Sequence, residues 1–128
     1  MAYNITRRTA GDFDVVVARV KEALKDEGFG VLTEIDVAGT LKVKIDKDFR
    51  PYRILGACNP NYAFEALSEE PHIGVMLPCN VIVQRYDNGE IEVSSIDPAT
   101  AMETVGNDKL IGVATQVRQA LERAIASV

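Results

Sequence analysis

The chain has 128 residues, 47% of them apolar and 26% charged, which predicts one globular domain over residues 1–128. Its net charge of −5 argues against nucleic acid or an anionic membrane as a partner, because neutralising phosphates requires a basic surface. No apolar run is long enough for a transmembrane helix and no signal-peptide pattern is visible, so we expect a cytoplasmic protein whose two cysteines are thiols.

The first third of the sequence predicts a strand, a long helix and a second strand. Alternating residues predict a strand over 3–8. Asp12 is a good N-cap for the helix that follows, and Gly28 stands where a left-handed residue ends a helix. The second strand is predicted over 31–36. The buried stripe of the helix is expected to contain Phe13, Val16, Val17, Val20, Ala23 and Leu24.

The middle of the chain alternates short helices with strands. Apolar residues recurring every four positions predict a short amphipathic helix over 37–46. A mostly apolar strand is predicted over 52–58. Asn59 and Pro60 then predict the N-cap and first residue of another helix, because proline lacks the amide that would have no partner there.

Asn88-Gly89 lies between two apolar-rich segments and predicts a β-hairpin. A two-residue turn would pair Arg85 with Glu92 as a cross-strand ion pair. Pro78 cannot donate to a ladder and therefore fits an edge, a bulge or the start of a strand. The same register places on one face of the hairpin Ile82, Tyr86, Ile91 and Val93.

The last quarter of the chain predicts a short helix and a long one. Asp97-Pro98 repeats the pattern of a capping residue followed by proline, and Asn107 is the expected cap of the final helix. Arg118 and Glu122 are expected to pair on its exposed side. Its buried stripe is expected to contain Leu110, Val113, Ala114, Val117, Leu121, Ala124 and Ile125.

This order of elements predicts an α+β fold, a two-layer sandwich in which two long helices pack on one face of a largely antiparallel sheet. Each long helix has only one apolar stripe, as expected for two layers. The other face of the sheet would then need to be covered by the short helices or by a partner subunit. This need is the main physical reason to expect a homodimer.

The two cysteines are the first candidates for chemistry. Cys58 ends a strand just before a helix, where the helix dipole favours a thiolate, and Cys79 follows Pro78. If their strands are neighbours, the sulfur atoms could face one another as a redox pair, a sulfur carrier or half of a soft-metal site. The alternative is that both are small, buried, apolar side chains.

Other chemistry has less support in the sequence. A structural zinc site needs four ligands, and His72 is the only histidine, for which a solvated loop position is expected, so no metal site is predicted. No acid–base pair or glycine-rich phosphate loop can be identified. Asn59 and Asn80 are expected to direct the backbone, Asn59 as a cap and Asn80 through an unusual local conformation. Arg53 and the amides at the start of the 60–69 helix could together hold a small anion.

Four segments carry a resemblance to a known family: "EALKDEGFGVLTEIDV", "YRILGACNP", "IGVMLPCNVIV" and "VSSIDPATAM". They resemble the DUF302 family of small bacterial and archaeal proteins, from about Val16 to the C-terminus. The resemblance implies a TBP-like β-α-β(4)-α core and dimers, but no function, cofactor or catalytic residue. The positions that match the family's signature are Cys58, Asn59, Pro60, Pro78, Cys79 and Asn80.

Two hypotheses follow. The first is a dimeric binding module for a small ligand, a sulfur species or a soft metal. Its site would consist of Cys58, Asn59, Cys79, Asn80 and Arg53. The second is a non-catalytic structural or interaction domain whose cysteines are packing residues.

Overall fold

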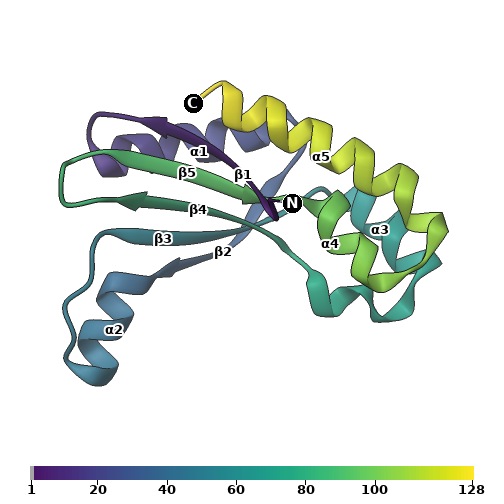
Figure 1. Cartoon of the computed structure of the whole chain (residues 1–128), viewed down its shortest axis with the longest axis horizontal. Coiled ribbons are helices and arrows are strands. Elements are labelled where there is room, and N and C mark those ends of the chain that lie inside the picture. The colour runs from purple at the N-terminus through teal and green to yellow at the C-terminus, as the bar shows by residue number, and fades with distance from the viewer. Residues whose placement is uncertain (1) are drawn as a thin grey trace.

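The computed structural model describes residues 2–128 and contains one five-stranded sheet in that range (Figure 1). The strand order is β1-β5-β4-β3-β2, and every neighbouring pair is antiparallel. The strands are β1 (Asn4–Thr9), β2 (Gly30–Asp36), β3 (Tyr52–Cys58), β4 (Cys79–Arg85) and β5 (Ile91–Ile96).

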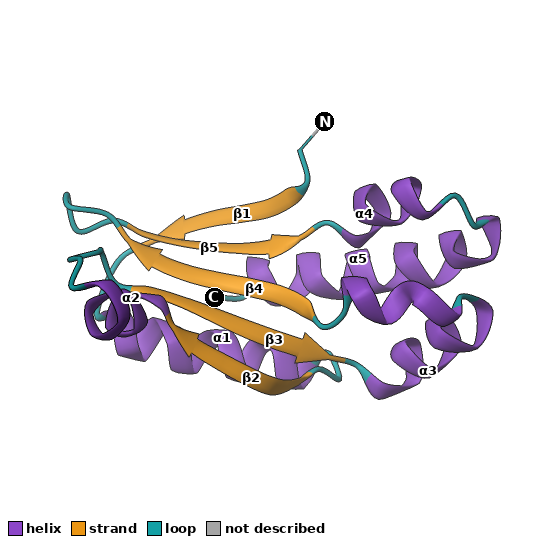
Figure 2. Ribbon diagram, turned by 90° about the horizontal axis from the view of Figure 1, so that it is seen from below, coloured by secondary structure: helices purple, strands orange, loops and turns teal. Residues whose placement is uncertain are grey.

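The two long helices lie on one face of this sheet, and the shorter helices lie at its ends (Figure 2). Figure 1 shows α3 and α4 beyond one end of the strands and α2 at the other. The predicted α+β class and β-α-β(4)-α core are therefore confirmed. The helices are α1 (Phe13–Asp26), α2 (Val37–Ile45), α3 (Pro60–Glu69), α4 (Pro98–Val105) and α5 (Ile111–Ala126), with short 3₁₀ helices η1 (Pro71–Met76) and η2 (Asp108–Leu110).

Local sequence signals set both ends of α1, as predicted. The Asp12 carboxylate accepts a hydrogen bond of 3.0 Å from the backbone amide of Val15. At the other end Gly28 has a φ of +87°, which suits glycine, and the amide of Phe29 donates to the carbonyl of Leu24 at 2.9 Å. This ending turns the chain into β2 and buries the Phe29 side chain.

The core lies between the sheet and the pair α1 and α5. Its sheet side consists of alternate residues, because successive side chains of a strand point to opposite faces. The fully buried members from the three central strands are Leu55, Val81, Val83, Ile91 and Val93. The predicted stripes of α1 and α5 meet them, with Val16, Val20, Leu24 and Leu121 at 1% exposure or less, so these helices are held by burial of their apolar faces.

The hairpin between β4 and β5 has a loop one residue longer than predicted. The amide of Tyr86 donates to the carbonyl of Glu90 at 2.9 Å, which leaves a three-residue loop over 87–89. Gly89 has a φ of +87° and so adopts the left-handed conformation that ends loops of this type with a bulge. The Asn-Gly pair therefore occupies the second and third loop positions, and the predicted two-residue turn is wrong.

The longer loop shifts the register of the hairpin. Arg85 is paired with Ile91, so the predicted ion pair between Arg85 and Glu92 is wrong. The Glu92 carboxylate instead lies 3.3 Å from Nε of Arg8 on β1. The predicted shared face of Ile82 and Ile91 is wrong for the same reason, since a one-residue shift moves a side chain to the other face.

We call the face of the sheet opposite α1 and α5 the open face (Figure 2). One row of paired residues crosses it from edge to edge, in the order Ile35, Ile54, Ile82, Ser94 and Thr6. The row is apolar over β2, β3 and β4 and polar over β5 and β1, where the last two hydroxyls lie 2.8 Å apart. This row is therefore apolar over half of its length, which we call the apolar half of the open face, while Asn80 and Gln84 flank Ile82 on the same face. An antiparallel sheet can expose such a face to water.

Proline marks the start of β4, which confirms one of the positions predicted for Pro78. Its ring packs against β3 at Gly56, where an added Cβ would lie 2.8 Å from Cγ of Pro78 and 2.1 Å from Oγ1 of Thr33. No side chain fits there without a shift of its neighbours. Asn107 caps η2 by accepting from the Lys109 amide at 3.0 Å, so α5 begins four residues after Asn107, later than predicted.

Gly56→Ala is expected to lower the free energy of unfolding by about 1–3 kcal/mol, because the added methyl group clashes with the Thr33 hydroxyl and with the rigid ring of Pro78. Gly112→Ala in α5 is the matched control, since an added Cβ there meets nothing within 4 Å. It is expected to raise the free energy of unfolding by up to about 1 kcal/mol through helix propensity. Chemical denaturation measures both, and an unchanged Gly56→Ala variant would contradict the packing of Pro78 on β3.

Candidate functional site

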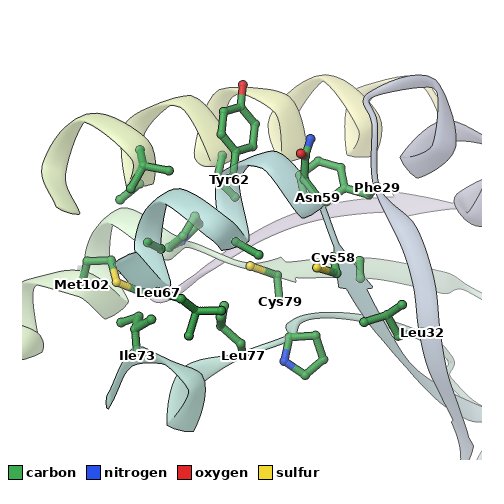
Figure 3. A pocket seen from close by; sticks show the side chains of 18 residues that line it. Phe29, Leu32, Cys58, Asn59, Tyr62, Leu67, Ile73, Leu77, Cys79 and Met102 are labelled. Atoms are coloured by element: carbon green, nitrogen blue, oxygen red, sulfur yellow. The ribbon is translucent and has the colours of Figure 1, made fainter. Parts of the chain in front are cut away.

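A cavity of about 320 Å³ lies where one end of the sheet meets α3, η1, α4 and α5 (Figure 3). Its walls come from segments far apart in the sequence. They are overwhelmingly apolar and include Leu67, Ile73, Leu77, Met102, Val113 and Val117. The volume falls within the range of about 300–1,000 Å³ that is typical of small-molecule pockets.

Small side chains keep this space open. Alanines contribute to the wall from three different elements, namely Ala57 on β3, Ala63 and Ala66 on α3, and Ala114 on α5. Larger apolar residues at these helical positions would satisfy the same amphipathic pattern and would fill the space. The size of the cavity therefore depends on residue volume rather than on polarity.

Cys79 lies in the cavity wall at the start of β4. Burial raises the pKa of its thiol to about 11, and repulsion from Cys58 adds a smaller contribution in the same direction. The thiol is therefore protonated at neutral pH. A protonated, largely buried thiol is a weak nucleophile and behaves mainly as a small polarisable wall group.

Cys58 also lines the cavity, but the predicted cysteine pair does not form, and both residues are free thiols. In the ladder Cys79 is paired with Ala57 and not with Cys58, and residues paired across a ladder share a face.

Asn59 occupies the N-cap position of α3, but its side chain makes no capping hydrogen bond. Its Nδ2 instead donates to the carbonyl of Glu27 at 3.5 Å and lies close to Gly28. The predicted capping bond is therefore wrong. The side chain ties the start of α3, and with it one wall of the cavity, to the turn that follows α1.

Asn80 and Arg53 do not line the cavity. Asn80 is an exposed residue of β4 paired with Gly56, on the opposite face from Cys79, and the unusual conformation predicted for it is absent. Arg53 lies at the other end of β3. Only Cys58, Asn59 and Cys79 of the predicted site residues are brought together in the cavity wall.

Arg53 takes part in an ion-pair cluster between the sheet and α1. Its guanidinium lies 2.8 Å from the Glu34 carboxylate and 3.7 Å from that of Asp14. A hydrogen bond from Lys21 is the largest influence on Glu34, and together with Arg53 it holds the pKa of that carboxyl below its usual value. Arg53 thus has carboxylate partners of its own and does not meet the amides of α3 that were predicted to join it in holding an anion.

A second ion pair holds the α4 side of the cavity. The Asp97 carboxylate caps α4 through the amides of Ala99 and Thr100 and accepts from Nε of Arg118 on α5 at 3.0 Å. Burial raises the pKa of Asp97, but the hydrogen bonds and charge of Arg118 and the cap amides outweigh it and lower the pKa overall. The pair joins α4 to α5 beside Pro98, which lines the cavity. The predicted pair of Arg118 with Glu122 is also present.

The described residues 2–128 contain no group of three or more His, Cys, Asp or Glu side chains placed to hold a metal ion. The His72 side chain is 92% exposed, as predicted, and lies outside the cavity wall. None of the helices in this range combines the length and the apolar character that crossing a membrane requires.

Most of the cavity wall was not anticipated as a site. Phe29, Leu32, Met102 and the residues from α5 were expected to be core or surface residues, because a helical stripe carries no sign of the space beside it. The one usable signal was the alternation of alanine with large residues on α3 and α5. Alanine is common on buried helix faces, so this signal has low specificity.

We expect alkylation of Cys79 to be slow at neutral pH and to accelerate about tenfold per pH unit up to about pH 10, because only its thiolate reacts. A Cys58→Ser variant isolates this thiol for reaction with iodoacetamide, followed by mass spectrometry. Free cysteine, which ionises near pH 8.5, is the reference and levels off earlier. The prediction is wrong if the Cys79 rate levels off at the same pH as that of free cysteine while circular dichroism still shows the native fold.

The comparisons with known proteins agree on one family. The model of the family described as "Domain of unknown function DUF302" matches residues 5–128. The fold is similar to a crystal structure of an uncharacterized conserved DUF302 protein from Bacillus stearothermophilus, with a TM-score of 0.93 and 26% sequence identity. The alignment covers 99% of this chain and 98% of that one. No curated protein matches the sequence. Because the family model spans nearly the whole sequence, the chain belongs to the DUF302 family.

Proposed function

We propose that this protein is a binding module that holds a small, mainly apolar molecule in the cavity, with Cys58 and Cys79 in the wall. The observation that carries the proposal is a partly open apolar cavity of about 320 Å³. Apolar wall surface that meets water is unfavourable, and removing it from water stabilises a complex. An apolar ligand that filled the space would bury this surface.

A sulfur species or a soft metal receives less support as the ligand. A metal site would need more donors than two thiols, and no third His, Cys, Asp or Glu joins them among residues 2–128. A dithiol mechanism would need the two sulfur atoms to face one another, whereas Cys79 pairs with Ala57 rather than with Cys58 and both residues are free thiols. The thiols fit better as polarisable contacts for an apolar ligand.

Filling the cavity should abolish binding. Ala63→Leu is expected to weaken binding of the neutral dye N-phenyl-1-naphthylamine at least about fivefold, because a leucine on α3 occupies space the ligand needs. Ala38→Leu is the matched control, a half-buried helical alanine on α2 outside the cavity wall. Its dye affinity should equal that of the wild type.

Dye fluorescence measures the affinities, and circular dichroism verifies that each variant is folded. The proposal fails if the dye does not bind the wild-type protein. It also fails if Ala63→Leu binds the dye as well as Ala38→Leu does.

The open face supports a second candidate, an interaction domain that forms homodimers. Its apolar half, from Ile35 to Ile82, is not covered by α1 or α5 (Figure 1). On the neighbouring α2, Val43 is 87% exposed. Contiguous exposed apolar surface is typical of protein interfaces. The expectation of a dimer assumes that the whole open face must be covered. Its polar half can remain in contact with water, which weakens that argument. The cytoplasmic location and the lack of nucleic-acid partners stay predictions from composition.

Ile35→Lys is expected to convert a dimer to a monomer, since it places a charge at the most exposed end of the apolar half of the open face. Val15→Lys on the outer side of α1 is the control, with a similar exposure of 48% against 46%. Light scattering after size-exclusion chromatography measures the mass. A wild-type protein that stays monomeric at high micromolar concentration would remove the dimer from the proposal without affecting the cavity.

A further inference from the structure

We infer that the cavity selects an uncharged ligand, such as a medium-chain alcohol, aldehyde or ketone or a compact hydrocarbon, over a carboxylate or an amine of the same size. This inference rests on the proposed binding function and goes beyond it by naming the chemical class. It follows from the charge, the polar groups and the size of the cavity.

The wall carries no ionisable partner for a charged ligand. None of the described residues that line the cavity is Lys, Arg, His, Asp or Glu. Asp97 precedes the lining residue Pro98, and its carboxylate is already paired with Arg118 and also accepts from an amide of α4. A carboxylate or ammonium group inside the cavity would lose its water without gaining a counter-charge, and such a loss opposes binding strongly.

The few polar side chains in the wall favour a weak hydrogen-bonding group at most. Figure 3 shows the Tyr62 hydroxyl and the Asn59 amide directed away from the sulfur atoms of Cys58 and Cys79. The Asn59 nitrogen already donates to the carbonyl of Glu27. The protonated thiol of Cys79 is left as a weak donor inside the wall. A hydroxyl or carbonyl oxygen suits such a donor and carries no charge into the cavity.

The start of α3 is the place where an anion would otherwise be favoured, because Asn59 leaves its first amides without a side-chain cap. Pro60 contributes no amide. Pro60 and Asn61 are both exposed and neither lines the cavity, whereas Asn59 and Tyr62 on either side of them do. The start of α3 therefore lies partly in the wall and partly in water, and an anion held there would keep contact with water.

The volume sets the size of the ligand. At the interior packing density of about 0.74, a space of about 320 Å³ holds about 240 Å³ of ligand atoms, which accommodates the flat aromatic dye and leaves spare room around an eight-carbon chain. An eight-carbon chain with one end group therefore fits in the cavity. The end group of such a ligand then lies against the apolar wall. Compounds of this length are therefore suited to test whether the cavity discriminates between charged and uncharged end groups.

Competition against bound N-phenyl-1-naphthylamine tests the inference with octan-1-ol, octanoate and octylammonium at pH 7. Octan-1-ol is expected to bind at least about tenfold more tightly than either ion, since only the ions lose their water without a counter-charge. Equal affinities would show that the end group reaches water and would overturn charge selection. Tighter binding of octanoate would overturn it too, as would failure of octan-1-ol to displace the dye.

Those results would leave the proposed binding function standing, because the dye itself would still bind. If neither the dye nor any octyl compound binds, the proposed function and this inference fail together. Ala63→Lys supplies a positive control for the chemistry, since a cation in the wall should raise the affinity for octanoate relative to octan-1-ol. Ala38→Lys on α2 should leave that ratio unchanged. Loss of the fold in Ala63→Lys would not affect the comparison of ligands on the wild-type protein.

Discussion

Antiparallel pairing of β3 with β4 is the constraint on which the rest of the structure depends. It places Ala57 opposite Cys79 and Gly56 opposite Asn80, and so decides which side chains face the helices and which face the open side. The close approach of Pro78 to Gly56 makes this register hard to change, because a slip by one residue would bring a side chain against the proline ring. The cavity wall, the separation of the two thiols and the apolar row of the open face all follow from this one pairing.

The cavity and the open face divide the candidate functions between two parts of the molecule. The cavity lies at the end of the sheet among α3, η1, α4 and α5, whereas the apolar half of the open face lies over β2, β3 and β4. A ligand in the first and a partner on the second would not compete for the same side chains. Leu32 is the exception, since it lines the cavity and is also 67% exposed within the edge strand β2. Ligand binding and self-association can therefore be tested with separate variants.

Sequence reasoning reached the elements because their signals are local. Asp12 and Asp97 cap helices through neighbouring amides, and the apolar stripes of α1 and α5 determine their buried faces within single helices. It failed where the outcome depends on register or on distant segments. One extra loop residue before Glu90 paired Arg85 with Ile91 instead of Glu92. The two Cys-Asn motifs are similar in sequence, but the ladder pairs Cys79 with Ala57 and not with Cys58. The cavity could not be anticipated, because it is a space between segments and no residue pattern encodes it.

The edge strand β2 affects whether the protein aggregates at high concentration. Its pairing with β3 is interrupted by a register shift between Val31 and Thr33, and it carries carboxylates at Glu34 and Asp36. Bulges and charges at an edge hinder the addition of further strands, which is how many proteins avoid aggregation into continuous sheets. Growth of the sheet through β2 from molecule to molecule is thus disfavoured, even though the backbone groups at that edge are unpaired.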